Sequence, residues 1–461
     1  MTMKRLTAVV AGIAAATLLA ACAPGEVVDD RTTQPADTAA PGGETTDGET
    51  GGGETTEEAP PAADPADFAG KTISYVYFTD GPDEQATRDL IAQFEEEYDV
   101  TVNLEVLAYA DLVTSVLNRL SGGNPPDVVR LTALTDFRND LLVLDDHLGA
   151  GYIDEFLEGP GIAVKNDDGQ MIAVPSDLTM NGPFINVDLF NEAGVELPDP
   201  ENPWSWDEMV EAGTAIKEAT GIPYAFAMDK SGHRLSTILS QYGTVMVDNG
   251  GLALDTGKAA EALQPLVDMM ANDDMPRDFW LGSGSRYEGA NEIFLAGDTP
   301  IYLSGNWQVG QFAENAEFEW TVAPNPCADE CGGFPGGKFM AAFKDAPEPE
   351  LAAEFIRFMN TPDAQAAFVA SFGALPTRSD LAESGVDYPA DWQDALDVFI
   401  ADLGRTPTNG YEANGNPAFS PSATALVEEL DEVVIGNKDM DTAMADTETK
   451  IQGILDELGS W

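Results

Sequence analysis

The sequence predicts an α/β fold in which helices cover a largely parallel sheet. Segments rich in β-branched and aromatic residues alternate with segments whose apolar residues recur at helical spacing. About 390 residues follow position 67, which is enough for two domains with cores of their own. The sequence shows no internal repeat of solenoid period, so a repeat architecture is not expected.

The first folded stretch shows the alternation most clearly. Three segments with little charge are expected to be strands: 71–79, 100–109 and 125–133. A helix is expected over 81–98, where the apolar residues share one face, and a second over 110–121, where a glycine pair ends it. This strand–helix–strand–helix–strand order indicates a parallel sheet with covering helices.

Later elements continue the pattern. After residues 171–190 a long helical region begins, and Ser205 is expected to cap its helix. A second unit of helices and strands ends in an expected strand over 300–307. The tail 423–458 is expected to be helical because its apolar residues recur at helical spacing.

The N-terminus has the features of a secretory signal peptide. Lys4 and Arg5 precede a short apolar run that is not long enough to span a bilayer. The run ends in Leu-Ala-Ala-Cys at Cys22, which resembles the bacterial lipobox, so residues 1–22 are expected to be a lipoprotein signal with Cys22 as the lipid-modified N-terminus. The alternative is an ordinary signal peptide with an incidental cysteine.

Residues 23–67 are expected to form a disordered acidic tether. They contain no aromatic residue and carry twelve acids against a single base. Such a segment cannot bury enough apolar surface to offset the entropy lost on ordering. A lipid at one end of the tether would hold the folded body near the membrane, outside the cytoplasm.

The charge balance excludes some partners. Acids outnumber bases 81 to 22, which gives a formal charge of −59. Binding to nucleic acid or to anionic headgroups requires lysine and arginine, so neither is expected. The acids are dispersed along the chain, which favours a solvated acidic surface and suggests a salt-adapted source.

Beyond Cys22, the cysteines are confined to one short segment. Cys327 and Cys331 are expected to form a small disulfide loop, as is usual outside the cell. The alternative, a metal site, would need further ligands, and the chain has only 2 histidines. No metal or cofactor is expected.

Several stretches together resemble one protein family. They include "YADLVTSVLNRLSGGNPPDVVRL", "AVPSDLTMNGPFINVDLFNEAGVELP", "PWSWDEMVEAG", "GDTPIYLSGNWQVGQF", "GGKFMAAFKDAPEPELAAEFIRFMNTPDAQAAF" and "GALPTRSD". Their order resembles that of family 1 extracellular solute-binding proteins, the sugar-binding lipoproteins of ABC importers. The resemblance runs from about Lys71 to Leu458.

The resemblance implies a two-lobed periplasmic-binding-protein fold with a ligand cleft and hinge crossovers between the lobes. The N-terminal lobe would comprise 68–180 and 330–375, and the C-terminal lobe 181–329 and 376–461. The implied partners are a small-molecule solute and the permease subunits of an ABC importer with their ATPase. The chain itself is expected to act as a monomer.

Candidate site residues follow from sugar chemistry. Aromatic rings cover the apolar face of a sugar, and carboxylates, amides and arginine bind its hydroxyls. Residues of these types near strand ends or in loops, and a glycine that admits close approach, are expected to bind ligand: Thr79, Asp80, Glu84, Tyr109, Arg130, Asp177, Trp280, Trp307, Gly337, Arg378 and Tyr411. The alternatives are a helix N-terminus for the acids, ion pairs for the arginines and core packing for the rings.

The ligand class stays open between two chemistries. The aromatic residues favour a mono- or oligosaccharide. Arginines in loop-like positions also leave room for an anionic sugar derivative or a glycerol phosphate: Arg130, Arg234, Arg286, Arg378 and Arg405.

Other functional classes are less consistent with the sequence. It contains no nucleophile elbow, zinc-protease motif or phosphate-binding loop. A lipid-anchored glycosidase needs only two carboxylates, so turnover of aryl glycosides is the assay that distinguishes it. A scaffold lipoprotein would not require the cleft that the strand–helix order builds.

Overall fold

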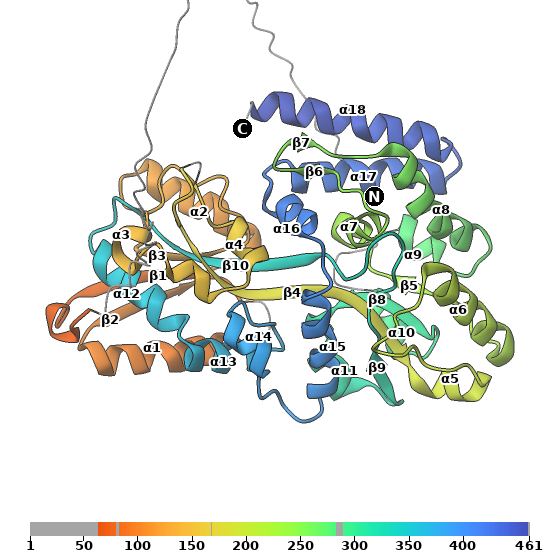
Figure 1. Cartoon of the computed structure of the whole chain (residues 1–461), viewed down its shortest axis with the longest axis horizontal. Helices are drawn as coiled ribbons and strands as arrows, with labels where there is room; N and C mark the ends of the chain where they lie inside the picture. The colour runs from red at the N-terminus through yellow and green to blue at the C-terminus, as the bar shows by residue number, and fades with distance from the viewer. Residues whose placement is uncertain (1–62, 80–82, 167, 283–288, 460–461) are drawn as a thin grey trace, which may run out of the picture. The chain divides into compact units, whose positions relative to one another are not determined.

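Three parallel strands form one end of the main sheet (Figure 1). The computed structural model describes residues 63–79, 83–166, 168–282 and 289–459. β1 (Thr72–Tyr77) pairs in parallel with β2 (Thr101–Val106) and with β3 (Val128–Leu131). α1 (Glu84–Tyr98) and α2 (Tyr109–Ser121) connect these strands. The expected α/β order of this region is confirmed.

Two strands carry the sheet from one half of the fold to the other. β4 (Val174–Asn186) pairs antiparallel with β10 (Pro335–Ala342) through its first half. Its second half pairs antiparallel with β8 (Ile301–Gly305) and β9 (Trp320–Val322), and β8 pairs in parallel with β5 (Ala227–Met228). The strand order is β2-β1-β3-β10-β4-β8-β5, with β9 beside β4.

The sheet as a whole is mixed, and the parallel pairing expected for the first region is confirmed for β1, β2 and β3. β10 comes after β8 and β9 in the chain. It lies between β3 and β4 in the sheet and is antiparallel to both. The remaining elements are η1 (Pro65–Asp67), α3 (Asp145–Leu148), η2 (Tyr152–Glu155), α4 (Glu158–Ile162), α5 (Val187–Ala193), α6 (Trp206–Thr220), α7 (Gly232–Gln241), β6 (Val247–Asp248), β7 (Gly251–Leu252), α8 (Thr256–Ala271), α9 (Arg277–Leu281), α10 (Ala290–Leu295), η3 (Asn306–Gln308), α11 (Val309–Asn315), α12 (Pro349–Met359), α13 (Pro362–Ala370), α14 (Ser379–Ser384), α15 (Gln393–Leu403), α16 (Thr408–Gly415), α17 (Phe419–Val434) and α18 (Met440–Leu458).

Two hydrophobic cores lie on the two sides of this arrangement. The first includes Phe94 and Phe355 and extends to Phe184 of β4. The second includes the neighbouring residue Ile185 and Leu426 of α17. Phe184 and Ile185 enter different cores because successive side chains of a strand point to opposite faces. β4 therefore contributes to both cores.

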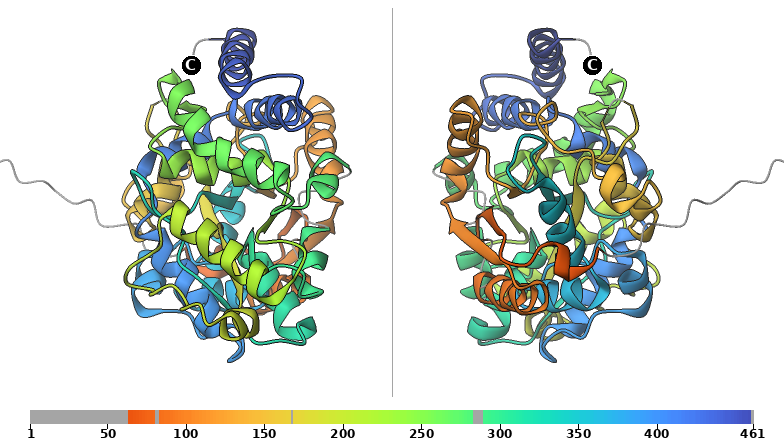
Figure 2. Two further views of the ribbon diagram at one scale, coloured as in Figure 1. Left: turned by 90° about the vertical axis from the view of Figure 1, so that its right-hand side faces the viewer. Right: turned by 90° about the vertical axis from the view of Figure 1, so that its left-hand side faces the viewer.

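The C-terminal segments divide between the cores. α17 and α18, drawn in dark blue, lie side by side at the top of both views in Figure 2 and belong to the second core. Apolar residues between Leu381 and Leu403 pack in the first core. The expected division of the chain into two lobes, with 376–461 in the second, stays a prediction. The first core thus contains side chains of α14 and α15 in addition to those of β1, β2 and β3.

The segment before β10 is held by a disulfide. Cys327 and Cys331 are joined, with their Cα atoms 4.4 Å apart. The backbone N–H of Cys327 donates to the carbonyl oxygen of Trp204 (2.7 Å), and that of Glu330 donates to Gln241 (2.8 Å). These bonds attach the start of the returning strand to α7 and to the segment that precedes α6.

Some sequence expectations lie outside the described residues. They are the signal peptide with Cys22, nearly all of the tether, Asp80 and Arg286. Within the described ranges, no helix combines the length and the apolar character needed to cross a bilayer. The same ranges contain no group of three or more His, Cys, Asp or Glu side chains placed to hold a metal ion.

Candidate functional site

Four buried charged side chains, the Arg130 cluster, lie where β3, β4 and β10 meet. They are Asp83, Arg130, Asp177 and Lys338. Arg130 donates through Nη1 to Asp83 (3.4 Å) and through Nη2 to Asp177 (2.9 Å), and Nζ of Lys338 lies 3.5 Å from the other oxygen of Asp177. Burial raises the pKa of Tyr77, so its hydroxyl stays protonated and donates to Asp83. The cluster contains two positive and two negative charges, which balance.

Aromatic rings surround the Arg130 guanidinium. Its Cζ atom lies 4.9 to 5.9 Å from the ring centroids of Tyr77, Phe78, Phe368 and Phe372. Nη1 also donates to the carbonyl oxygen of Phe78 (3.0 Å). A guanidinium tolerates such burial when rings cover its faces and acceptors take its N–H groups. Arg130 therefore contributes to the interior of the fold at the end of β3.

Tyr109 provides an exposed ring above this cluster. Its side chain is 53% exposed, and its ring packs on Phe78 at a centroid distance of 5.1 Å. Its hydroxyl lies 3.3 Å from Oγ1 of Thr132, which follows β3 directly. Thr79, the residue after Phe78, is exposed. Tyr109 thus lies at the carboxyl ends of β1 and β3, where open α/β sheets bind ligands.

A second buried charged group, the Asp229 cluster, lies in the other half of the sheet. The carboxylate of Asp229 accepts hydrogen bonds from the Tyr302 hydroxyl (2.6 Å), Oγ of Ser304 (2.7 Å) and Nη2 of Arg234 (2.9 Å). The Cζ atom of Arg234 lies over the ring of Trp307, 4.4 Å from its centroid. The cluster joins β8, the residue after β5 and the first turn of α7 to Trp307.

Trp307 is half-buried and lies directly against the backbone. A Cβ atom at Gly305 would fall 2.2 Å from the indole ring and 2.7 Å from the carbonyl oxygen of Met180. Only glycine therefore allows the ring to lie in this place. The neighbouring Asn306 accepts a hydrogen bond from the N–H of Met180 (2.8 Å) and so fastens this turn to β4.

The middle of β4 connects the two clusters. Nδ2 of Asn181 donates to Oγ1 of Thr237 (2.8 Å) and to the carbonyl oxygen of His233 (3.3 Å), both in α7. A Cβ atom at Gly336 of β10 would lie 2.5 Å from Oγ1 of Thr179 and 3.6 Å from the His233 ring. The short stretch of β4 between the two clusters thus touches β10 and α7, and it is the candidate site.

Two expected ligand-binding rings lie in packed surroundings. Trp280 has no exposed surface, and its Nε1 donates to Asp431 of α17 (2.9 Å). Lys230 lies over the same ring, 5.8 Å from its centroid. Tyr411 is buried against Gly159 of α4, where a Cβ atom would lie 2.7 Å from the ring. As placed, both rings fill protein interior.

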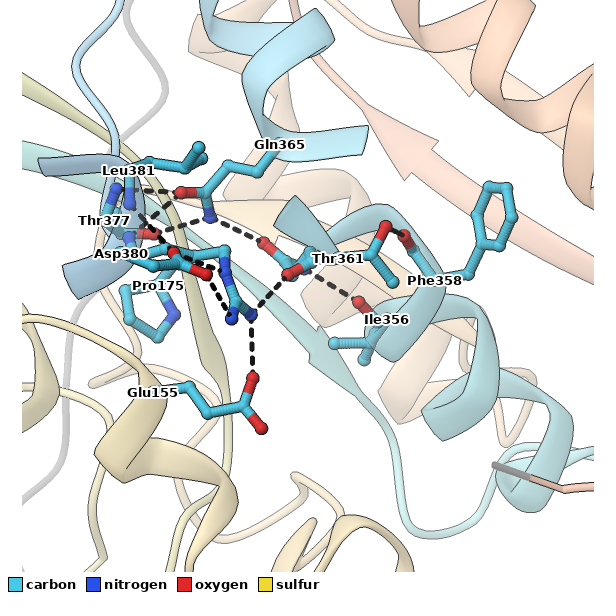
Figure 3. A network of polar contacts seen from close by, with 11 residues as sticks. Glu155, Pro175, Ile356, Phe358, Thr361, Gln365, Thr377, Asp380 and Leu381 are labelled. Atoms are coloured by element: carbon cyan, nitrogen blue, oxygen red, sulfur yellow. Dashed lines mark hydrogen bonds and ion pairs between the residues drawn. The ribbon is translucent and has the colours of Figure 1, made fainter. Parts of the chain in front are cut away.

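Arg378 anchors a network of polar contacts, shown in Figure 3. It donates through Nη1 to Glu155 (2.8 Å) and to the carbonyl oxygen of Asn360 (3.1 Å), and through Nε to Asp380 (3.0 Å). Its backbone N–H donates to Oε1 of Gln365 (3.0 Å). The guanidinium thus links η2, α14 and the end of α12, and the backbone of Arg378 adds a bond to α13.

The two remaining candidates also have structural contacts. A Cβ atom at Gly337 would lie 3.2 Å from the carbonyl oxygen of Asp177 and 3.2 Å from the Leu178 side chain. The glycine therefore permits close approach of β10 to β4. Glu84 forms an ion pair with Arg88 one turn later in α1 (2.7 Å).

Sequence reasoning missed the polar partners within both clusters. They are Asp83, Lys338, Asp229, Tyr302 and Ser304. Asp229 had a usable signal, since it directly follows the apolar run "YAFAM" and the first polar residue after a strand often faces a site. For Asp83 the sequence offered no signal that distinguished it from the other acids near the start of α1.

The fold and the candidate site together define a class of proteins. Two hydrophobic cores share one mixed sheet. Charged and aromatic residues from both halves of the sheet lie beside β4 and β10, the strands that cross between the halves, as in two-lobed binding proteins. The sequence model of bacterial extracellular solute-binding proteins matches residues 89–399. The chain belongs to this family, and the expected family resemblance is confirmed.

Individual relatives bind different solutes. An arabinooligosaccharide-binding protein of Halalkalibacterium halodurans is 25% identical over 309 residues, which are 63% of this chain and 68% of that protein. An sn-glycerol-3-phosphate-binding periplasmic protein of Agrobacterium fabrum is 22% identical over 301 residues, 63% of this chain and 68% of that protein. These relatives are binding proteins.

A solved structure supports the fold assignment. The crystal structure of the cyclic alpha-maltosyl-1,6-maltose binding protein from Arthrobacter globiformis aligns with a TM-score of 0.70 and 21% identity. The alignment covers 84% of this chain and 99% of that one. The two-lobed fold that the resemblance implied is therefore confirmed.

Proposed function

We propose that the chain is an extracytoplasmic receptor that binds a neutral carbohydrate at the middle of β4 and delivers it to an ABC importer. The observation that favours a neutral ligand is the pairing of the arginines. Among the residues that the structure describes, Arg130 and Arg234 lie close to the candidate site, and both are bound to carboxylates of the protein itself. The relatives that bind sugars support the carbohydrate class.

The charges near the site are already compensated. Arg130 is paired with Asp83 and Asp177, and Arg234 is paired with Asp229. An anionic ligand would have to compete with buried carboxylates for these cations. Separating a buried ion pair is strongly unfavourable because it leaves a charge without a partner in a medium of low polarity. A sugar hydroxyl needs no such exchange.

Two aromatic rings at the site offer surface to a sugar. Tyr109 is exposed in the first half of the sheet, and Trp307 is half-buried in the second. Rings in both halves can hold a sugar between them when the halves approach about the β4 and β10 crossings. The ligand then supplies the free energy that favours the closed state.

Anchoring and delivery complete the proposal. Cys22 carries the lipid, residues 23–67 act as the tether, and the monomeric receptor docks on permease subunits with their ATPase. A Cys22→Ala variant is expected to leave the membrane fraction and to be recovered in the soluble one. Retention of that variant at the membrane would contradict the lipid anchor.

A thermal-shift screen of the purified chain in molar salt tests the ligand. The panel contains maltotriose, arabinotriose, a uronate and sn-glycerol 3-phosphate. A ligand at a hundred times its Kd adds about 2.7 kcal/mol to the free energy of unfolding, which a melting curve detects. We expect a neutral sugar to raise Tm, Trp307→Ala to abolish the shift, and the matched control Trp280→Phe to retain it.

Other outcomes decide between the alternatives. A shift with sn-glycerol 3-phosphate alone would replace the neutral ligand by the anionic one, as for the Agrobacterium fabrum relative. Turnover of aryl glycosides by the purified chain would overturn the receptor in favour of a glycosidase.

A further inference from the structure

We propose that Asp229 is a positioning residue of the candidate site. It holds Arg234 against Trp307, and Arg234 in turn sets the plane of the indole ring. The role toward a ligand rests on the proposed function, whereas the role toward the ring does not. Asp229 itself has no exposed surface, so we expect it to act through Arg234 and not through direct contact with a ligand.

The carboxylate of Asp229 is fixed from three sides. It is fully buried and accepts hydrogen bonds from Tyr302 and Ser304 of β8 in addition to the bond from Arg234. Tyr302 and Ser304 are two residues apart in one strand, so their side chains point to the same face of the sheet. The hydrogen bonds from β8 therefore fix the position of the carboxylate independently of Arg234.

Arg234 transmits this position to the ring. Its Cζ atom lies 4.4 Å from the centroid of Trp307, so the planar guanidinium covers one face of the indole. The structure offers an internal comparison, because Lys230 lies over the Trp280 ring at the longer distance of 5.8 Å. Lys230 is bound to Asp431 of α17, and both side chains of that pair are partly exposed.

A ring that stacks on a sugar must keep its plane when no sugar is present. Gly305 lets the end of the indole touch the backbone, and Arg234 covers a face of the ring. These two contacts restrict rotation of the side chain. A ligand then finds a preorganised ring and loses less entropy on binding.

The first test observes the ring without any ligand. Tryptophan in the full chain is replaced by fluorotryptophan, and the fluorine NMR resonances of Trp307 and Trp280 are assigned with Trp307→Phe and Trp280→Phe. Asp229→Asn removes the negative charge that holds Arg234 and replaces one of the two acceptor oxygens by an amide nitrogen, so the Trp307 resonance is expected to shift and broaden. The Trp280 resonance is expected to stay in place, which shows that the fold is intact.

Two further variants make this test decisive. Arg234→Gln is expected to shift the Trp307 resonance as Asp229→Asn does, and it carries the test if Asp229→Asn does not fold. Lys230→Gln is the matched control, since it removes a cation over the other ring and is expected to move only the Trp280 resonance. An unchanged Trp307 resonance in a folded Asp229→Asn or Arg234→Gln variant would overturn the proposal.

The second test measures binding of the sugar from the panel that gives the largest thermal shift. Its Kd is expected to rise about tenfold in Asp229→Asn and to be unchanged in Lys230→Gln. A shifted Trp307 resonance with an unchanged Kd would overturn the role of Asp229 toward the ligand. If no panel member binds the wild-type chain, the proposed function fails, and the NMR result alone decides the role toward the ring.

Discussion

The Arg130 cluster and the Arg378 network differ in how far their carboxylates are exposed to solvent. Both arginines are buried and both were expected to face a ligand. The partners of Arg130, Asp83 and Asp177, are also completely buried. The partners of Arg378 reach solvent, with Glu155 and Asp380 43% and 51% exposed. In the first group every charge is removed from water, whereas in the second only the arginine is.

This difference separates two structural roles for the same residue type. A buried ion pair is costly to break because removing one partner leaves the other charge unsolvated. An ion pair with an exposed partner is weak because water replaces the lost contact. The Asp229 cluster lies between these cases, since its carboxylate is buried but also accepts two hydroxyl hydrogen bonds. Stability measurements should therefore rank the three groups.

The largest loss is expected for Arg130→Met. The variant leaves Asp83 and Asp177 buried without the arginine that bridges them, so the free energy of unfolding should fall by about 3–5 kcal/mol. Urea denaturation measures the loss. Arg88→Met, which breaks the exposed pair with Glu84, is the control and should cost no more than about 0.5 kcal/mol.

A small effect of Arg130→Met would contradict the assignment of this cluster to the interior. If the loss stayed below about 1 kcal/mol, the carboxylates would have to be hydrated, and the end of β3 would be open to solvent.

An intermediate loss is expected for Tyr302→Phe. The change removes one of three donors to the buried carboxylate of Asp229, and a hydrogen bond to a charged group contributes about 1.5–3 kcal/mol. Ser304→Ala removes another donor and is expected to have a similar effect. If neither variant altered the urea midpoint, the carboxylate would not depend on the hydroxyls, and the preorganisation of this cluster would be refuted.

A small loss is expected for Glu155→Gln. Arg378 keeps its bonds to Asp380 and to the Asn360 carbonyl, and the lost partner is largely solvated, so the cost should be at most about 1 kcal/mol. The matched control is Glu354→Gln, which changes a glutamate that is also paired with an arginine but is buried. A larger loss for the exposed glutamate than for Glu354 would reverse the ranking by burial.

The sequence was sufficient to predict the strand–helix order of the first region. Its strands are nearly free of charge and its helices begin with acids, so local composition and periodicity agree. The place of β10 could not be predicted in this way, because the insertion between β3 and β4 depends on contacts far apart in the chain. Local patterns do not encode such pairings.

The candidate site was predictable only in its residue types. Arg130 and Trp307 stand at strand ends, which the sequence indicates, and their roles toward a ligand stay predictions. The partners of Arg130 could not be chosen from 81 acids by spacing. Trp280 was expected in a loop, but α9 places it in the second core, where its Nε1 donates to the partly exposed carboxylate of Asp431.

The smallest expected effect is on the pH dependence of stability, and it again involves Arg378. Its hydrogen bonds hold the pKa of Asp380 below the usual value of about 3.9. A carboxylate whose pKa is lowered by folding stabilises the native state above the pKa of the unfolded chain, and this contribution disappears as the pH falls through the lowered value. The stability difference between wild type and Asp380→Asn should therefore be constant near neutral pH and shrink below about pH 4. Because Asp380 is half exposed, molar salt should also reduce the difference. A difference that grew on acidification would mean that Arg378 does not favour the charged form of Asp380.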